Sequence, residues 1–361
     1  MIDLQAMLAD LELLVNTESP SLDLPRLTIS ALALAGVIER RLGSAPQLIE
    51  GPAGPHVHWS GGGTPKVLIV GHHDTVFPVG SCAARPFTVA AGRATGPGIF
   101  DMKAGVVQAI HAVASLTDRS GVEILINSDE EVGSRTSRAL IEERALACGN
   151  VLVCEASADG GALKTARKGT GTFEVVVHGR AAHAGLEPEK GINSLVAAAE
   201  LITRIATFGD PATATTVTPT VAVAGTADNV VPAEARVKVD VRVEQPGEKE
   251  RLEGLFGSLV SSVPGAVVEV SGGIDRPPMP ASASARLFPL AVDAGAAIGM
   301  GEVRGVGVGG GSDGNFTAAL GVPTLDGLGA VGGGAHADHE FVLVDTMVER
   351  AQLLAALITR I

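Results

Sequence analysis

Residues 66–74 read KVLIVGHHD, an apolar run that ends abruptly in a glycine, two histidines and an aspartate. Two later segments have the same form, VEILINSDEE at residues 122–131 and VLVCE at residues 151–155. Strands that are apolar at every position are buried on both faces, as in a parallel sheet covered by helices. Helical periodicity separates them at residues 102–116 and 137–147. The alternation predicts an α/β fold with an open, mostly parallel sheet and helices on both faces, where ligands gather at the carboxyl ends of the strands.

The pattern changes near residue 169, where partly alternating strands replace the uniformly apolar ones. The expected elements follow the order β-α-β-β-α-β, at residues 170–178, 191–208, 215–224, 233–243, 247–262 and 266–270. This is the order of the ferredoxin-like split βαβ unit. We therefore expect an inserted domain at residues 169–280, and a catalytic domain made of residues 1–168 and 281–361. Insertion is tolerated at exposed loops, and 361 residues are enough for two domains.

Charge and composition disfavour several classes of protein. The formal net charge is −13 without a basic stripe, whereas nucleic-acid binding needs grouped Lys and Arg to neutralise phosphates. The sequence contains no uninterrupted run of ~18 apolar residues, so no membrane span is expected. The N-terminal segment MIDLQAMLADLELL lacks the basic start and apolar core of a signal peptide, and the three cysteines lack metal-clip spacing. A cytoplasmic protein without a membrane or nucleic-acid partner is expected.

His72 and Asp74 close the first apolar strand. Residues two apart in a strand face the same side, so these side chains converge while His73 points away. A metal-bound histidine usually donates its second ring nitrogen to a carboxylate or carbonyl, a task that suits Asp74. A polar turn in which Asp74 caps the chain is the alternative interpretation.

Five further residues have side chains that suit metal binding. Asp101 precedes a helix, where Asp is commonly an N-cap, although a carboxylate can also bridge two cations. Glu130 and Glu131 follow a buried strand, and a solvated acidic turn is as reasonable there as a binding site. Glu155 ends the third strand, and His336 lies in a glycine-rich loop. Two histidines and three carboxylates, one of them shared, suit two zinc ions that ionise a bridging water and polarise a carbonyl.

Six segments in this order resemble the co-catalytic dizinc family of glutamate carboxypeptidases, acetylornithine deacetylase, succinyl-diaminopimelate desuccinylase and aminoacylases. They are GHHDTVFP (71–78), GPGIFDMKAG (96–105), NSDEEVGS (127–134), GRAAHAG (179–185), GGGSDGNF (309–316) and AHADHE (335–340). The resemblance covers almost the entire chain. GRAAHAG followed by PEKGIN (188–193) is most similar to the glutamate carboxypeptidase branch. Relatives often carry a second Asp after the bridging one, and Met102 stands there in this chain.

The resemblance implies a role for each position of the metal centre. His72 and Glu155 would bind one zinc ion, Glu131 and His336 would bind the second, and Asp101 would bridge both. Each subunit would therefore hold two Zn²⁺ ions, with Co²⁺ or Mn²⁺ as substitutes.

The resemblance also assigns the proton-transfer chemistry. Glu130 would be the general base that takes a proton from the bridging water and passes it to the leaving nitrogen. Asp74 would orient His72. The peptide bond between Asp101 and Met102 would be cis, although neither residue is proline.

The inserted domain would act as the lid and dimerisation domain of a homodimer. His183 would donate to the oxyanion, in dimeric relatives from the neighbouring subunit. Asn229 and Arg276 would bind the free carboxylate of a small-molecule or short-peptide substrate. Two alternatives stay open, because His183 could be a turn residue and Arg276 could cover apolar surface with its stem.

The implied function is that of a metal-dependent amide hydrolase of the glutamate carboxypeptidase type. Such an enzyme would release a C-terminal amino acid, with glutamate expected, from an N-acyl or peptide conjugate. An N-acyl-amino-acid deacylase of the acetylornithine deacetylase type, or a dipeptidase, is the alternative among enzymes. A catalytically dead homologue that binds metal or ligand is the alternative outside enzymes, but it should have lost the base, and Glu130 is present.

Overall fold

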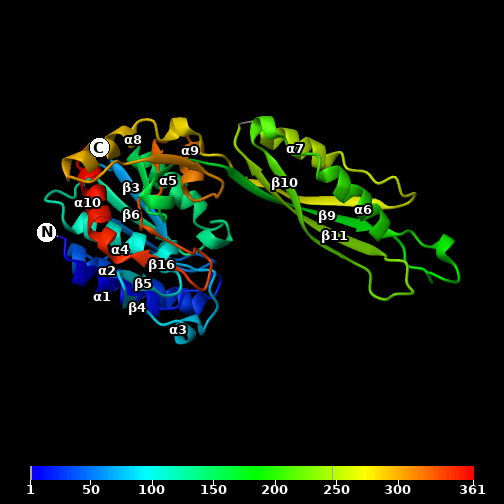
Figure 1. The fold of residues 1–361 in the computed structure, drawn as a ribbon, viewed down its shortest axis with the longest axis horizontal. Helices are drawn as coiled ribbons and strands as arrows, with labels where there is room; N and C mark the ends of the chain where they lie inside the picture. Colours follow the sequence, from blue (N-terminus) through cyan, green and yellow to red (C-terminus); the bar gives the residue numbers. More distant parts are fainter. Residues whose placement is uncertain (1, 246) are drawn as a thin grey trace. The chain divides into compact units, whose positions relative to one another are not determined.

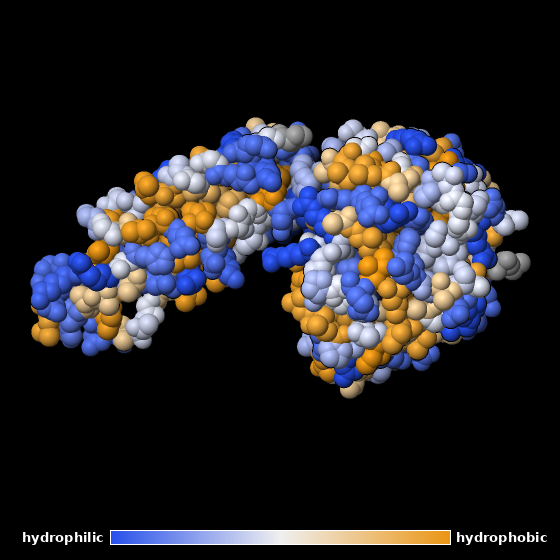
Figure 2. Space-filling model, turned by 180° about the vertical axis from the view of Figure 1, so that it is seen from behind, coloured by the Kyte–Doolittle hydropathy of each residue, from blue (hydrophilic) through white to orange (hydrophobic). Residues whose placement is uncertain are grey.

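The computed structural model describes residues 2–245 and 247–361. The chain divides into two compact units (Figure 1). The larger unit consists of Met1–Arg167, Met279–Val308 and Ser312–Ile361, and the smaller unit of Lys168–Pro278 with Gly309–Gly311. Among the described residues, no helix combines the length and the apolar character needed to cross a membrane. On the face drawn in Figure 2, hydrophilic and hydrophobic residues are interspersed over both units.

A six-stranded sheet forms the centre of the larger unit, in the order β1-β2-β6-β3-β7-β14. Its strands are β1 (Gln47–Ile49), β2 (His56–Ser60), β3 (Val67–His72), β6 (Val122–Asn127), β7 (Val151–Val153) and β14 (Thr324–Leu325). The four strands from β6 to β14 run parallel, whereas β1 and β2 add an antiparallel edge. A mixed α/β fold is therefore confirmed, and the antiparallel edge is the part that was not predicted.

Helices cover both faces of this sheet (Figure 1). Val67 and Ile69 of β3 pack into one core, whose helices are α1 (Leu4–Asn16), α2 (Leu24–Leu42), α4 (Ala104–Ala114), α8 (Leu287–Ala297) and α10 (Met347–Ile358). Leu68 and Val70 pack on the other face, against α5 (Arg138–Cys148), which contacts α9 (Gly314–Ala319). Every residue of β3 is buried, which is why its residues before Gly71 and His72 are all apolar.

Two smaller sheets complete the larger unit. Strand β13 (Gly305–Val308) pairs in parallel with β8 (Leu163–Arg167). The second sheet has the order β15-β16-β5-β4, from strands β4 (Thr88–Ala90), β5 (Arg93–Thr95), β15 (Gly332–Gly333) and β16 (Phe341–Leu343). Phe341 pairs with Thr95, so the loop before β16 meets the loop after β5.

The smaller unit has the element order β-α-β-β-α-β. Its elements are β9 (Gly169–His178), α6 (Ser194–Ile205), β10 (Thr216–Ala224), β11 (Glu234–Val243), α7 (Glu248–Gly257) and β12 (Val267–Arg276). The strands form an antiparallel sheet in the order β10-β11-β9-β12, and its core includes Phe173, Val175 and Val177 of β9. Strand β12 continues beyond the predicted residues 266–270, because its ladder with β9 persists through Gly272 and Gly273.

Candidate metal centre

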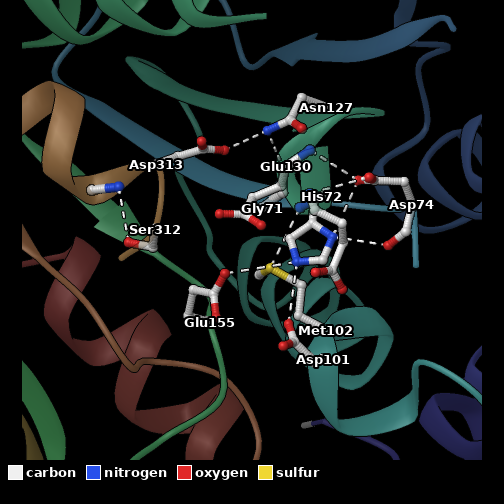
Figure 3. A network of polar contacts seen from close by, with 12 residues as sticks. Gly71, His72, Asp74, Asp101, Met102, Asn127, Glu130, Glu155, Ser312 and Asp313 are labelled. Atoms are coloured by element: carbon white, nitrogen blue, oxygen red, sulfur yellow. Dashed lines mark hydrogen bonds and ion pairs between the residues drawn. The ribbon is translucent and has the colours of Figure 1, made fainter. Parts of the chain in front are cut away.

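His72 ends strand β3 with its ring buried at the carboxyl edge of the sheet (Figure 3). Its Nδ1 donates to the carbonyl oxygen of Asp74 at 3.0 Å, since that oxygen can only accept. A neutral His72 therefore presents a lone pair from Nε2. This Nε2 faces Asp101 Oδ1 at 3.2 Å and Glu155 Oε1 at 3.7 Å. A histidine held in this tautomer is suited to bind a cation.

His73 turns away from the cluster, as the alternation of side chains along a strand predicts. Its Nδ1 lies 3.1 Å from Ser30 Oγ, and its Nε2 lies 3.1 Å from the carbonyl oxygen of Pro55. Burial lowers the pKa of His73 to about 4, so this ring is neutral and structural.

Asp101 lies between two histidines. Its Oδ1 faces His72, whereas its Oδ2 lies 3.3 Å from His336 Nε2. The two oxygens of one carboxylate thus point towards different imidazole rings, which is the arrangement of a bridging ligand. The peptide bond between Asp101 and Met102 is cis, as predicted. Met102 Sδ accepts from the backbone N–H of His72 at 3.4 Å, so a methionine fits beside the strand end.

Glu131 meets His336 on the other side of Asp101. Its Oε2 lies 3.1 Å from His336 Nε2, and its Oε1 is buried without a hydrogen-bonding partner among the described residues. An unpaired buried carboxylate oxygen is costly unless a cation or a water meets it. The position of Glu131 Oε1 therefore favours an ion in this cluster.

Two groups of side chains have ligand atoms within 4.8 Å of one another. The first contains His72, Glu130 and Glu155, and the second contains His72, Asp101 and Glu131. They come from the carboxyl end of β3 and from the segments that follow β5, β6 and β7. This is where open α/β sheets bind their ligands.

Asp74 is fully buried and connects two strand ends. Its Oδ1 accepts from the backbone N–H of Glu130 at 3.1 Å, and its Oδ2 from that of Glu131 at 3.3 Å. Ser21 Oγ donates to the same Oδ2 at 2.7 Å. The carbonyl oxygen of Asp74 orients His72, while its carboxylate fixes the turn that carries both glutamates.

The electrostatics of the cluster favour a cation. Burial and the nearby charge of Asp101 raise the pKa of Glu155 to about 7. Burial alone would also raise the pKa of Asp101, but hydrogen bonds from His336 and His72 outweigh burial and hold it well below its usual range. Hydrogen bonds to Asp101 and Glu131 raise the pKa of His336 to about 10. Carboxylates this close repel one another, and the imidazoles can compensate only by holding protons.

A divalent ion fits this donor set without those protons. Nitrogen from histidine and oxygen from carboxylates are the ligands that zinc accepts, with room for water at an open position. The same set also suits Co²⁺ and Mn²⁺ in part, so the residues indicate a divalent metal centre and not its element.

Two features of the site were missed from the sequence. Arg167 and Asp326 form a buried pair, with Nε to Oδ2 at 2.7 Å and Nη2 to Oδ1 at 3.0 Å, and Arg167 Nη2 lies 3.7 Å from Glu155 Oε2. Glu340 accepts three backbone N–H groups around Asp101. Glu340 is the last residue of the motif AHADHE (335–340), so the sequence did contain a signal for it. No sequence pattern marked Arg167 as buried.

The smaller unit brings His183 and Asn229 together. The N–H of Ala184 donates to the carbonyl oxygen of Asn229 at 2.8 Å, and His183 forms an isolated bridge with Val230. His183 Nδ1 accepts from the backbone N–H groups of Gly185 and Leu186, both at 3.1 Å, so a neutral ring carries its proton on Nε2. Both predicted side chains are exposed.

Arg276 lies elsewhere in the smaller unit. It is the last residue of β12, is buried, and pairs with Thr170 near the start of β9. The structure therefore does not place Arg276 beside Asn229 in the same chain, although both were predicted to bind the substrate carboxylate.

Residues 68–360 match the family described as peptidase family M20/M25/M40. The chain is 33% identical to Carboxypeptidase G2 from Pseudomonas sp. (strain RS-16) over 315 residues, which cover 82% of this chain and 74% of that protein. It is 29% identical to succinyl-diaminopimelate desuccinylase from Rhodospirillum centenum, over 56% of this chain and 58% of that protein.

The fold is also found among solved structures. The M20 family metallo-carboxypeptidase Sso-CP2 from Sulfolobus solfataricus superposes with a TM-score of 0.78 at 17% identity, covering 97% of this chain and 98% of that one. At this identity the likeness concerns the fold alone.

Proposed function

Since the chain belongs to peptidase family M20/M25/M40 and is a metal-dependent hydrolase, we propose that it is a carboxypeptidase of the glutamate carboxypeptidase type. It would release a C-terminal amino acid, preferably glutamate, from an N-acyl or peptide conjugate. The 33% identity to Carboxypeptidase G2 over most of the chain supports this type. Retention of Glu130 argues against a catalytically dead homologue.

The observation that carries the proposal is the arrangement of Asp101 between His72 and His336. We assign one ion to His72, Asp101 and Glu155, and a second to Asp101, Glu131 and His336. Zinc is the proposed element, with Co²⁺ or Mn²⁺ as substitutes. When bound, such ions supply Lewis acidity, which polarises the scissile carbonyl and makes water acidic.

Glu130 is the proposed general base. It offers an oxygen close to ligand atoms of His72 and Glu155, but neither of the two ligand sets assigned above includes it. Its carboxylate would take the proton of the attacking water and deliver it to the leaving nitrogen, so that the amide is cleaved into an amine and an acid. Asp74 would keep this carboxylate in place, because it accepts the N–H of Glu130 at 3.1 Å.

The smaller unit would recognise the substrate and form a homodimer. Arg276 would bind the substrate carboxylate through its planar guanidinium, and Asn229 would contribute a second polar contact. His183 would donate from Nε2 to the developing oxyanion. The ring is prepared for this task, because two backbone amides occupy Nδ1.

Substrate profiling of the zinc-loaded protein tests this assignment. We expect kcat/KM for folate-like N-acyl-glutamates to exceed that for N-acetyl amino acids, N-succinyl-diaminopimelate and dipeptides by at least about tenfold, since a matched polar contact discriminates more strongly than an apolar one. A preference for the N-acetyl or N-succinyl substrates would favour the deacylase alternative. Full metal loading without turnover of any amide would favour a binding protein.

A further inference from the structure

Glu340 lies four residues after His336 and only 1% of its side chain is exposed. Its Oε2 accepts the backbone N–H of Gly98 at 2.8 Å. Its Oε1 accepts the N–H groups of Phe100 and Asp101, at 2.8 and 2.9 Å. Three N–H groups of one loop thus converge on a single buried carboxylate.

The receiving loop is bent so that its amides can point the same way. Gly96 has φ 152° and Gly98 has φ 71°, a backbone conformation that glycine adopts without strain. Successive N–H groups in such a turn form a concave site for an anion. Hydrogen bonds from N–H groups to a carboxylate are shorter and stronger than neutral ones. Glu340 therefore fixes the backbone from which the Asp101 side chain projects.

The other end of the same contact is the segment that carries His336. That segment turns at Gly334, where Ala337 N–H donates to the Gly334 carbonyl at 2.9 Å, and Glu340 N–H donates to the Ala337 carbonyl at 3.1 Å. His336 has φ 62° and is exposed, with a side chain 51% accessible, so burial does not hold its ring. Its placement depends on where the segment is anchored, and Glu340 is the buried anchor.

We propose that Glu340 is a positioning residue that sets Asp101 and His336 at the spacing needed for one shared divalent ion. The contact links two segments that are about 240 residues apart in sequence, directly next to the strand pairing of Phe341 with Thr95. The inference rests on the metal assignment of the proposed function. It adds that the ion held by Asp101, Glu131 and His336 depends on Glu340, whereas the ion held by His72, Asp101 and Glu155 depends on it less.

Glu340→Gln tests the proposal, because the amide keeps the size of the side chain but replaces one acceptor oxygen by a donor. Affinities for two equivalents of Zn²⁺ are measured by competition with a chromophoric chelator, and Co²⁺ binding is followed by visible absorption. We expect one of the two binding steps to lose about 10–100-fold in affinity, the range typical of residues that orient metal ligands, and the other step to change by less than about threefold. Excess Zn²⁺ should restore most of kcat.

Two further variants separate positioning from general destabilisation. Glu200→Gln removes a carboxylate that accepts the backbone N–H of Ser262 in the smaller unit, and it should leave both affinities unchanged. Glu340→Asp keeps the charge but shortens the reach, so it should also weaken the same step, and it decides the matter if the Gln variant is insoluble.

Unchanged affinity at both steps, or equal loss at both, would overturn the role of Glu340. Failure of the proposed function has a different signature. A wild-type protein that binds one ion would refute the metal assignment, and one that binds two ions without cleaving N-acyl-glutamates would refute only the substrate assignment.

Discussion

His183 and Arg276 lie at opposite ends of the same antiparallel sheet. Arg276 pairs with Thr170 near the start of β9, whereas His183 follows five residues after His178, where β9 ends. A strand rises by ~3.3 Å per residue, so the length of β9 alone separates the two ends by about 25 Å. A small substrate cannot touch both residues of one chain. If both act on it, one of them comes from a second copy, which is the arrangement that the proposed homodimer provides.

Mixing of two inactive variants tests this donation. His183→Ala lacks the oxyanion donor, and Glu130→Gln lacks the base, so each homodimer should be nearly inactive. In a mixed dimer, the site with intact Glu130 receives His183 from its partner. Random exchange should restore about a quarter of the sites, since half of the dimers are mixed and each has one complete site. An inactive mixture, after exchange has been verified by mass spectrometry, would show that His183 acts within its own chain.

Arg276→Ala should chiefly raise KM for substrates with a free C-terminal carboxylate. A hydrogen bond to a charged group contributes ~1.5–3 kcal/mol, which corresponds to about a 10–100-fold change. The guanidinium meets the carboxylate in the ground state and the transition state alike, so kcat should change little. Arg276→Lys keeps the charge without the planar fork and should recover only part of the affinity. An equal rise in KM for a substrate with an amidated C-terminus would argue for a structural role of Arg276 instead.

The strands that carry the candidate metal centre could be predicted because a strand buried on both faces is apolar at successive positions, and this pattern is visible in a short stretch of sequence. Leu68 and Ile69 point to opposite cores, so residues 67–70 of β3 are all apolar, and the first polar residue, His72, is the last of the strand. Strand β2, which lies between β1 and β6, was harder to predict, because its sequence HVHWS mixes polar and apolar residues. Glycines such as Gly272 likewise obscured the second half of β12, which is held by its pairing with β9 and by the burial of Ile274 in the core.

The residues of the candidate site also divide into those that the local sequence marks and those that it does not. His72, Asp101 and Glu131 stand next to strand or helix ends in the sequence, and the structure brings them together. The contacts of Arg167 with Asp326 and of Glu340 with Asp101 join residues 159 and 239 positions apart. Such pairs form only in the tertiary structure, so no local sequence pattern predicts them.

Glu130→Gln should retain both metal ions and lose activity. The amide cannot accept a proton, and loss of a general base typically lowers kcat by ~10²–10⁴-fold. Elemental analysis should still find the wild-type metal content, because neither proposed ligand set includes Glu130. Glu143→Gln, at an exposed glutamate of α5, is the matched control and should behave as wild type. Near-normal turnover of the Glu130 variant would exclude the proton-transfer role.

Protein purified without chelator should contain two divalent ions per chain. Dialysis against a chelator should abolish turnover, and Zn²⁺, Co²⁺ or Mn²⁺ should restore it to different extents. Glu131→Gln should keep one ion and lose the other, since it removes a ligand of the second ion only. Full activity at one ion per chain would refute the dinuclear assignment.

Asp10 provides a prediction for stability that is separate from the metal centre. Its buried carboxylate joins three helices, with hydrogen bonds from Arg40 and Arg41 at 2.7 Å and from His111 at 2.8 Å. Burial alone would raise the pKa of Asp10, but the hydrogen bonds from His111 and the two arginines outweigh burial and hold it well below its usual range. The charged form is therefore the stabilising one, and its contribution is complete above the unfolded-state pKa of ~3.9. It is lost as the pH falls from there through the lower pKa of the folded state.

Asp10→Asn should accordingly destabilise the metal-free protein at pH 7 by on the order of 2 kcal/mol, which lowers Tm by about 5 °C. The difference in the free energy of unfolding between this variant and wild type should stay constant down to pH ~5. It should shrink below pH ~4, where the unfolded wild-type chain takes up a proton that the folded chain does not. Glu12→Gln, at an exposed carboxylate of the same helix α1, should change Tm by less than about 1 °C at each pH. Thermal unfolding followed by circular dichroism at pH 7, 5 and 3 measures these differences. A Tm difference that is the same at pH 3 as at pH 7 would mean that the packing of Asp10, and not its charge, holds the three helices together.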